Sequence, residues 1–578
     1  MNENEDFSGR LQFLNVVIVL IIAVLIGRAG YLQVYDGELY ARLAEGNRIR
    51  IIPAEAARGT FYDRNGEPLV TNRPGFTVSL LPLTEPISPE VIARVSKLIN
   101  VPIEEIQKKI DAHVGFDPIR IKNDVLPDIV TIIEEQKDDY PGVVIEVLPI
   151  RDYIYGEYAA HVFGYVSEIN EEELERRKDE GYKSGYIIGK FGLERIYDKE
   201  VRGINGGDQV EVDVSGRPVQ ILGRQSPIPG NDLILTIDKH IQETAERAVD
   251  EQLALVHAYA AAAVVMNPQT GEVLAMVSRP AFNPNLFAGG ISTQNWNVLN
   301  NNPYHPMDNK AITGEYPPGS TFKTLIADAA LTAGVTNPDE VFTCTGELAI
   351  GSDYVLHESH GEVHGQLRLA DALRESCNVT FATLALRLGG KGLASAFERF
   401  GIGTELADTE ISMAVAHVPE LKQLADGEIA QIGIGQGALL VTPMQMALVA
   451  DAFANGGRIM QPYLVEQVLT AQGTPLYEAS PTVWRTATTA QRAAVIDGWM
   501  ADVVAAGTGT AADVAGVRVT GKTGTAENAT GTDHAWFIGT AEHGGRKIVL
   551  SVLVEEGGYG GRAAAGIARR IISRYFEG

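Results

Sequence analysis

The chain carries the sequence YPPGSTFK at Tyr316–Lys323, and a stretch rich in alanine and leucine follows as far as about Ala333. We expect a helix there, with Ser320 at its start. Because positions i and i+3 share one face of a helix, the Lys323 amine comes within hydrogen-bonding reach of the Ser320 hydroxyl. A serine attacks well only when a base removes its proton, and a buried lysine can be that base. Taken alone, Ser-x-x-Lys is common, and a helix N-cap is the simpler interpretation of Ser320.

Two further segments strengthen the catalytic interpretation. Ser376-Cys377-Asn378 lies between two amphipathic helical runs, and in such a non-helical joint residues i and i+2 point the same way. A hydroxyl and an amide would therefore face one cleft. The sequence GKTGT at Gly521–Thr525 follows an alternating stretch, which predicts a strand whose glycines let a ligand approach the backbone.

Two nucleotide-binding interpretations of glycine-rich segments are weaker. Gly516 and Gly521-Lys522-Thr523 have the spacing of a Walker A loop, but the residues that follow lack the apolar periodicity of the required helix. The segment Gly433–Ala438 matches a dinucleotide fingerprint without a βαβ unit around it, so we interpret it as a tight loop before a helix that starts near Pro443.

The flanks of these motifs predict an α+β domain. Ala262–Met266 and Glu272–Val277 form a predicted hairpin, and His534–Thr540 and Lys547–Glu555 are further strand patterns. A closing helix is expected at Arg562–Phe576. Strands at both ends of the domain, enclosing alanine-rich helices, suggest an antiparallel sheet sandwiched by helices.

The preceding part of the chain divides into an anchor and a second domain. The charge-free stretch Leu11–Gly27 is apolar enough for one transmembrane helix, and an uncleaved anchor fits better than a signal peptide because the first ten residues are acidic. A mixed α/β pedestal follows, up to the Pro/Gly-rich boundary at Ser226–Asn231. We therefore predict an anchor at 1–35, a pedestal domain at 36–230 and a third domain at 231–578.

Composition narrows the classes of function. The 578 residues have globular proportions of apolar and charged side chains, and the formal net charge of −26 makes nucleic acid an unfavourable partner. Two cysteines exclude a disulfide-stapled scaffold. No firm metal site follows from the sequence; a zinc site, a disulfide between the cysteines and surface histidines near a cleft all stay open. The zinc candidates are Cys344, His357, His360, His364 and Cys377.

The three motifs, in this order, resemble the signature of the penicilloyl serine transferases. With the anchor and the pedestal, the chain most resembles class B penicillin-binding proteins of the elongation-type penicillin-binding protein 2 group. Four further stretches carry this resemblance: RGTFYDRNG at Arg58–Gly66, IGKFGLE at Ile188–Glu194, LTID at Leu235–Asp238 and HAWFIG at His534–Gly539. The resemblance implies a dimerisation-type pedestal and a penicillin-binding (transpeptidase) domain.

The resemblance also implies a role for each motif residue. Ser320 is the expected nucleophile, Lys323 its base, Ser376 the proton relay and Lys522 an electrostatic partner, while Asn378 holds the substrate amide. The backbone N–H groups of Ser320 and Thr525 would form an oxyanion hole. The expected substrate-binding residues are Thr523, Gly524 and Thr525.

The implied function is crosslinking of peptidoglycan stem peptides by a serine D,D-transpeptidase, without a cofactor, outside the bacterial cytoplasmic membrane. Expected partners are the D-Ala-D-Ala stem peptides, β-lactams, a SEDS-family glycan polymerase and the cell-wall elongation machinery. The alternatives are a β-lactam-binding sensor or a non-catalytic scaffold. A β-lactamase fits less well, because the sequence offers no convincing carboxylate to activate water on the acyl-enzyme.

Overall fold

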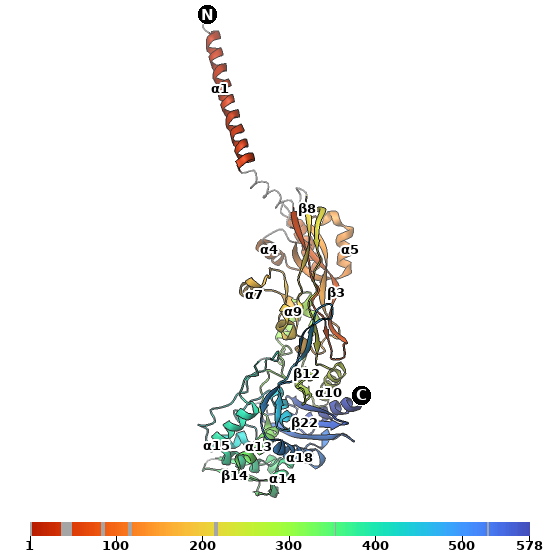
Figure 1. Cartoon of the computed structure of the whole chain (residues 1–578), viewed down its shortest axis with the longest axis vertical. Helices are drawn as coiled ribbons and strands as arrows, with labels where there is room; N and C mark the ends of the chain where they lie inside the picture. Colours follow the sequence, from red (N-terminus) through yellow and green to blue (C-terminus); the bar gives the residue numbers. More distant parts are fainter. Residues whose placement is uncertain are drawn as a thin grey trace. The chain divides into compact units, whose positions relative to one another are not determined.

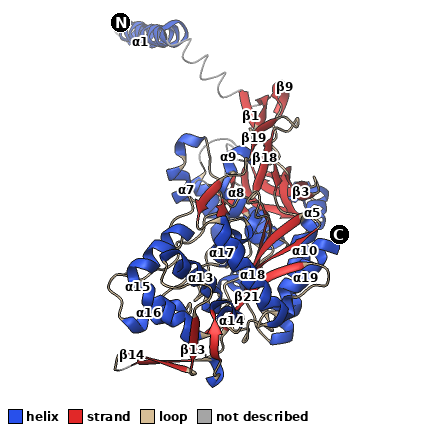
Figure 2. Ribbon diagram, turned by 60° about the horizontal axis from the view of Figure 1, so that its bottom comes forward, coloured by secondary structure: helices blue, strands red, loops and turns tan. Residues whose placement is uncertain are grey.

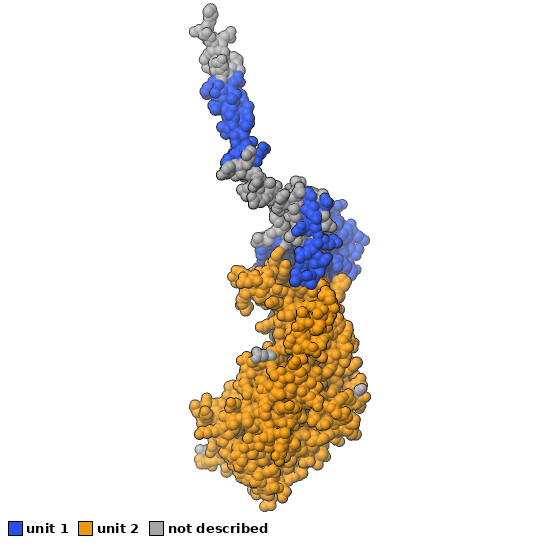
Figure 3. Space-filling view, in the orientation of Figure 1, with its two compact units in different colours: residues 1–57, 75–148, 204–228 blue, residues 58–74, 149–203, 229–578 orange. Residues whose placement is uncertain are grey.

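The structure is a computed structural model that describes residues 3–35, 49–81, 87–113, 118–212, 218–352, 354–407, 409–528 and 531–577 (Figure 1). Residues 36–48, where the predicted pedestal begins, lie outside the described residues. The chain forms two compact units, coloured separately in Figure 3. Unit 1 comprises residues 1–57, 75–148 and 204–228, and unit 2 comprises residues 58–74, 149–203 and 229–578. The predicted domain limits stay a prediction.

Unit 1 begins with helix α1 (Glu3–Gly30), which a short π-helix (Tyr31–Tyr35) continues. The segment Phe13–Gln33 has a mean hydropathy of 2.4 over its most apolar window, and none of that window is buried. Its 21 residues suffice to cross a bilayer. It is the one helix among the described residues with that length and composition, which agrees with the predicted membrane anchor.

The rest of unit 1 is built from strands covered by amphipathic helices. β1, β8 and β9 form an antiparallel sheet. The C-terminal half of β3 pairs with β4, and α3 turns Val91, Val95 and Ile99 into the core beside these strands. The elements are β1 (Ile49–Ala54), β3 (Pro68–Leu80), β4 (Ile119–Val125), β5 (Val143–Tyr153), β8 (Gly206–Val212), β9 (Pro218–Gln225), α3 (Pro89–Ile99), α4 (Ile103–Ala112) and α5 (Pro127–Glu135).

Within unit 2, the two pedestal stretches RGTFYDRNG and IGKFGLE meet in a buried ion-pair cluster. Arg58 donates from Nε to Glu194 Oε2 (3.0 Å) and from Nη1 to Asp198 Oδ1 (2.9 Å). Arg151 donates from Nε to Glu194 Oε1 (2.5 Å). Side-chain exposure in the cluster is 8% or less. Each buried charge thus faces an opposite one, which compensates for its lost hydration.

The centre of unit 2 is a five-stranded sheet with the order β12-β11-β23-β22-β21, antiparallel throughout. β11 consists of AAAVVM, and every residue of it is buried. Such a run can be buried on both faces of a sheet only where helices cover both. The strands are β11 (Ala261–Met266), β12 (Val273–Arg279), β21 (Arg518–Ala526), β22 (His534–His543) and β23 (Arg546–Val554). The predicted hairpin and strands are confirmed.

Helices cover both faces of this sheet, as Figure 2 shows. Alternate residues of β11 enter two different cores: Ala261, Ala263 and Val265 pack with α10 and α19. Ala262, Val264 and Met266 belong to the larger core, which includes α13 and α17. The helices are α10 (Lys239–Val256), α13 (Lys323–Ala333), α17 (Pro443–Ala454), α18 (Ala490–Ala506) and α19 (Ala564–Glu577). The predicted α+β sandwich is confirmed.

The segment after α13 leaves the helical layer, forms a hairpin enclosed by a second antiparallel strand pair, and returns into α14. β13 pairs with β16, and β14 with β15. We call residues 341–368 the excursion. Its elements and the next two helices are β13 (Val341–Cys344), β14 (Glu347–Ile350), β15 (Tyr354–His357), β16 (Gly365–Arg368), α14 (Leu369–Arg374) and α15 (Asn378–Phe400).

The remaining elements of unit 2 do not belong to the five-stranded sheet or to the helices described above. β10 pairs with β2 and β18, and the N-terminal half of β3 pairs with β2. They are β2 (Phe61–Tyr62), β6 (Val166–Glu168), β7 (Ile187–Gly189), β10 (Asp232–Leu235), β17 (Arg458–Met460), β18 (Val465–Leu469), β19 (Pro475–Glu478), β20 (Val483–Thr486), α6 (Ala160–Phe163), α7 (Glu171–Arg176), α8 (Gly192–Ile196), α9 (Asp198–Val201), α11 (Asn285–Ala288), α12 (Thr293–Asn300) and α16 (Asp426–Gly433).

Candidate active site

Ser320 lies in a single 3₁₀ turn (Gly319–Phe322) that leads directly into α13. The loop before it is held in place by Trp536, whose Nε1 donates to the carbonyl of Pro317 (3.0 Å). Gly319 has φ +55°, and a β-carbon there would lie 2.8 Å from the Thr525 carbonyl oxygen. Glycine is therefore required where the turn lies against β21. The predicted position of Ser320 at a helix start is confirmed.

Ser376 occupies an unusual backbone position between α14 and α15. Its φ is +61°, the left-handed region that normally favours glycine. The Cys377 N–H donates to the Ala372 carbonyl (2.9 Å) and the Ser376 N–H to that of Leu373 (3.2 Å). This is the Schellman pattern that ends a helix. The joint thus ends α14 at Arg374 and allows α15 to begin at Asn378.

Lys323 connects the first two motifs. Its amine donates to Asn378 Oδ1 (2.7 Å), to the Ser376 carbonyl (2.6 Å) and to Ser376 Oγ (3.3 Å). The hydroxyl and the amide of the joint therefore face the same side, as predicted. The predicted bond from Lys323 to Ser320 Oγ is not among those that this amine makes within the described residues.

Lys522 brings in the third motif from β21, the edge strand of the sheet. Its amine donates to Ser376 Oγ (3.0 Å) and to the Thr523 carbonyl (2.9 Å). The Thr523 hydroxyl shares a hydrogen bond with that of Thr508 (2.6 Å). β21 is followed by β22 rather than by a helix, so the context of a Walker A loop is absent from this segment. Ser376 Oγ thus contacts both lysine amines.

The surroundings of the two lysines destabilise their charged forms. Both side chains are fully buried, and the oxygens that accept their hydrogen bonds are all uncharged. Burial lowers the pKa of Lys323 to about 8, although the Glu358 carboxylate acts in the opposite direction. Burial, together with the nearby charge of Lys323, holds the pKa of Lys522 well below its usual value. A base that is partly neutral near pH 8 can accept a serine proton.

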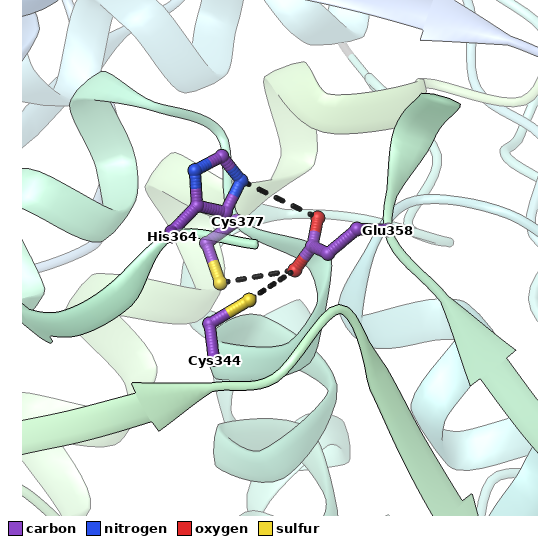
Figure 4. Close-up of side chains that lie close together, drawn as sticks. All are labelled: Cys344, Glu358, His364 and Cys377. Atoms are coloured by element: carbon purple, nitrogen blue, oxygen red, sulfur yellow. Dashed lines mark hydrogen bonds and ion pairs between the residues drawn. The ribbon is translucent and has the colours of Figure 1, made fainter. Parts of the chain in front are cut away.

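A second cluster of polar side chains lies beside the joint (Figure 4). One ligand atom from each of four side chains falls within 4.8 Å of the others: Cys344, Glu358, His364 and Cys377. Two sulfurs, an imidazole nitrogen and a carboxylate oxygen suit Zn²⁺, whose tetrahedral sites place donor atoms about 3.3–3.8 Å apart. The Cys377 and Cys344 sulfurs lie 3.0 and 3.4 Å from Glu358 Oε1.

The structure gathers three of the five zinc candidates and leaves two outside. His357 and His360 are exposed on the excursion. Both cysteines are free thiols, so no disulfide joins them. Glu358 completes the cluster, although the sequence motifs did not single it out. The available signal was an acidic residue within the histidine-rich segment HESH.

Comparison with known proteins decides the family. The family model of the penicillin binding protein transpeptidase domain matches residues 261–573, more than half of the chain. The chain belongs to this family. The penicillin-binding protein dimerisation domain matches residues 53–235, in the region predicted to be the pedestal.

The matches between this penicillin-binding protein and its relatives cover nearly its whole length. It is 30% identical to the peptidoglycan D,D-transpeptidase MrdA of Acinetobacter baumannii, over 97% of this chain and 87% of the relative. A peptidoglycan synthase complex that coordinates polymerization and crosslinking contains a chain with a TM-score of 0.72 and 27% identity, over 99% of both chains. Penicillin-binding protein 2 of Helicobacter pylori, in complex with MreC, shares the fold with a TM-score of 0.78 at 23% identity, over 92% and 99% of the chains. The predicted resemblance to the penicillin-binding protein 2 group is confirmed.

Proposed function

We propose that the chain is a peptidoglycan D,D-transpeptidase that works through an acyl-enzyme on Ser320. The observation that carries this proposal is the hydroxyl of Ser376, which accepts hydrogen bonds from both Lys323 and Lys522 beside the turn that bears Ser320. The family and its relative of 30% identity, a D,D-transpeptidase, support the same activity.

The first half of the reaction is acyl transfer to the enzyme. Neutral Lys323 accepts the Ser320 proton while Oγ attacks the carbonyl carbon of the penultimate D-Ala. The backbone N–H groups of Ser320 and Thr525 stabilise the oxyanion. The C–N bond then breaks, and the leaving terminal D-Ala takes a proton from Ser376 Oγ. Lys323 replaces that proton with the one it took from Ser320, and Lys522 acts as an electrostatic partner beside Ser376. The products are free D-Ala and an ester on Ser320.

The second half forms the crosslink. An amine from a neighbouring stem peptide attacks the ester carbonyl and loses a proton along the same chain of groups in reverse. The Ser320 oxygen leaves and is reprotonated, so the enzyme is regenerated. Asn378 holds the peptide amide of the donor in both halves. Thr523, Thr525 and Lys522 bind the carboxylate of its terminal D-Ala before that residue leaves, with Gly524 leaving room for it.

The chemistry also indicates where the enzyme acts. Peptidoglycan lies outside the cytoplasmic membrane, so we place unit 2 on that side and α1 in the membrane. The partner we propose is a SEDS-family glycan polymerase within the cell-wall elongation machinery. The synthase complex described above, which couples polymerization to crosslinking, supports this pairing.

The test is intact mass spectrometry of the detergent-solubilised chain with a penicillin, in the wild type and in Ser320→Ala. We expect one long-lived adduct in the wild type and none in folded Ser320→Ala. A second assay uses pentapeptide-bearing glycan. Release of D-Ala together with formation of a crosslinked product would distinguish an enzyme from a sensor. Rapid loss of the adduct with turnover would instead indicate a β-lactamase, and no adduct would leave a scaffold.

We further propose that Cys344, Glu358, His364 and Cys377 hold a structural Zn²⁺. The donor set and spacing support it, and four protein ligands leave no open position for catalysis. Metal analysis of the purified chain should give about one zinc per chain, and a Cys344→Ser/His364→Gln double variant should lose it. Absence of zinc from wild-type protein prepared without chelator would refute the site.

A further inference from the structure

Glu358 is a buried acid in an otherwise exposed part of the excursion. It is 5% exposed, whereas its neighbours His357 and Ser359 are exposed. A carboxylate loses much hydration on burial, so it needs compensating hydrogen bonds or charges. Thiol groups supply part of this compensation through the contacts of Cys344 and Cys377 with Oε1.

The stronger compensation comes from the first turn of α15. Glu358 Oε2 accepts the backbone N–H of Asn378 (2.9 Å), and Oε1 accepts that of Val379 (2.7 Å). The first amides of a helix have no partner within the helix, and its N-terminus favours negative charge. Glu358 therefore caps α15 from a different segment of the chain.

Asn378, whose N–H binds Glu358, also forms a hydrogen bond with Lys323. Asn378 Oδ1 accepts from Lys323 Nζ (2.7 Å), and Asn378 Nδ2 donates to the His357 carbonyl (3.2 Å). The excursion thus holds both the main chain and the side chain of Asn378. Two residues earlier lies Ser376, whose left-handed backbone persists only where its surroundings fix it.

We infer that Glu358 is a positioning residue of the transpeptidase: by binding the two amides, it fixes Ser376 and Asn378 against Lys323. This inference rests on the proposed function. It does not depend on zinc, since a carboxylate has about four lone-pair sites and the amide bonds use only two. Glu358 contacts no substrate in this role.

The test separates acylation from binding. For a fluorescent penicillin, we expect Glu358→Gln to lower the acylation rate constant about 10- to 100-fold, because small misplacements of catalytic groups have effects of that size. The dissociation constant of the preceding complex should change much less than the acylation rate constant. Rates are measured per titratable active site, so partial unfolding does not imitate the effect.

Two variants serve as controls. Glu362→Gln makes the same chemical change on the same loop, on an exposed side chain, and should acylate at the wild-type rate. Cys344→Ser leaves the amide bonds in place, so it should lose metal but retain more of the acylation rate than Glu358→Gln. If Glu358→Gln does not fold, Glu358→Asp replaces it, because it keeps the charge but is too short to reach both amides.

Either of two results would overturn the inference: a normal acylation rate in folded Glu358→Gln or Glu358→Asp, or an equal loss in Cys344→Ser, which would assign the effect to the metal. An absence of any adduct in the wild type would instead refute the proposed function, so the two failures are distinguishable.

Discussion

Unit 2 contains two groups of buried basic side chains, and the two groups differ in the side chains that accept their hydrogen bonds. In the pedestal cluster, Arg58 lies between the carboxylates of Glu194 and Asp198. At the candidate active site, Lys323 and Lys522 share the neutral hydroxyl of Ser376. The neighbouring carboxylates hold the pKa of Arg58 above its usual value in spite of burial, whereas burial lowers those of both lysines.

The difference distinguishes a structural role of a buried cation from a catalytic one. A buried cation beside a carboxylate stays charged and fixes the segments that carry the pair. A buried amine without a carboxylate contact gives up its proton more easily, and this is the property that a general base requires. The next four experiments test this contrast.

The largest effect is expected from Lys323→Met. Loss of the general base should slow acylation by a penicillin about 10²- to 10⁴-fold. Because the substitution also removes a buried charge that lacks a carboxylate partner, the thermal unfolding midpoint should stay the same or rise. Stopped-flow acylation and differential scanning fluorimetry measure the two quantities. A large fall in the midpoint would mean that Lys323 holds the structure in the way that Arg58 does.

Glu194→Gln should have the opposite profile. It leaves the guanidinium groups of Arg58 and Arg151 short of a buried carboxylate, which costs about 3–5 kcal/mol. We expect a clearly lower unfolding midpoint, together with a normal acylation rate per titratable active site. An unchanged midpoint would show that the pedestal cluster contributes little stability.

The pH dependence of acylation should report the lysine. With a pKa of about 8, Lys323 is mostly protonated below that pH, so the rate should rise with pH through about 8 and then level off. The stability of the fold depends on pH in the same direction. The pKa of Lys323 in the folded chain lies below the ordinary 10.5, so the unfolded chain binds more protons between the two values. The contribution of Lys323 to stability therefore increases with pH across that window. A flat acylation profile between pH 6 and 9 would argue against a lysine base.

The smallest effect is expected from an exposed pair on α10. Arg247 Nη2 lies 2.7 Å from Glu243 Oε1, and the two side chains are 65% and 52% exposed. Arg247→Ala should change the unfolding free energy by about 0.5 kcal/mol or less, because water screens exposed pairs. A chemical denaturation curve compared with that of Glu194→Gln would show whether burial, rather than charge pairing as such, produces the effect.

The sequence was sufficient where local pattern and structure agree. The helix expected to start near Pro443 is α17, which begins at that residue, and the hairpin of β11 and β12 follows from its apolar runs. The three motifs that we propose to be catalytic could be placed on a helix start, a joint and a strand, because each has its own periodicity or breaker.

Contacts between distant segments could not be predicted in the same way. A serine in the left-handed position of a helix end contradicts the glycine preference, so nothing local indicated the conformation of Ser376. The capping of α15 by Glu358 joins residues 20 and 21 positions apart. The direction of the Lys323 amine toward Asn378 likewise depends on packing between helices.

The left-handed backbone of Ser376 also has a genetic consequence. A change to glycine would relieve the strain of a side chain at φ +61° while it removes the hydroxyl. Such an allele would encode a protein that is folded, long-lived and inactive. In a cell that also carries the normal copy, it would compete for the glycan polymerase that we propose as partner, so we expect a dominant rather than a recessive phenotype.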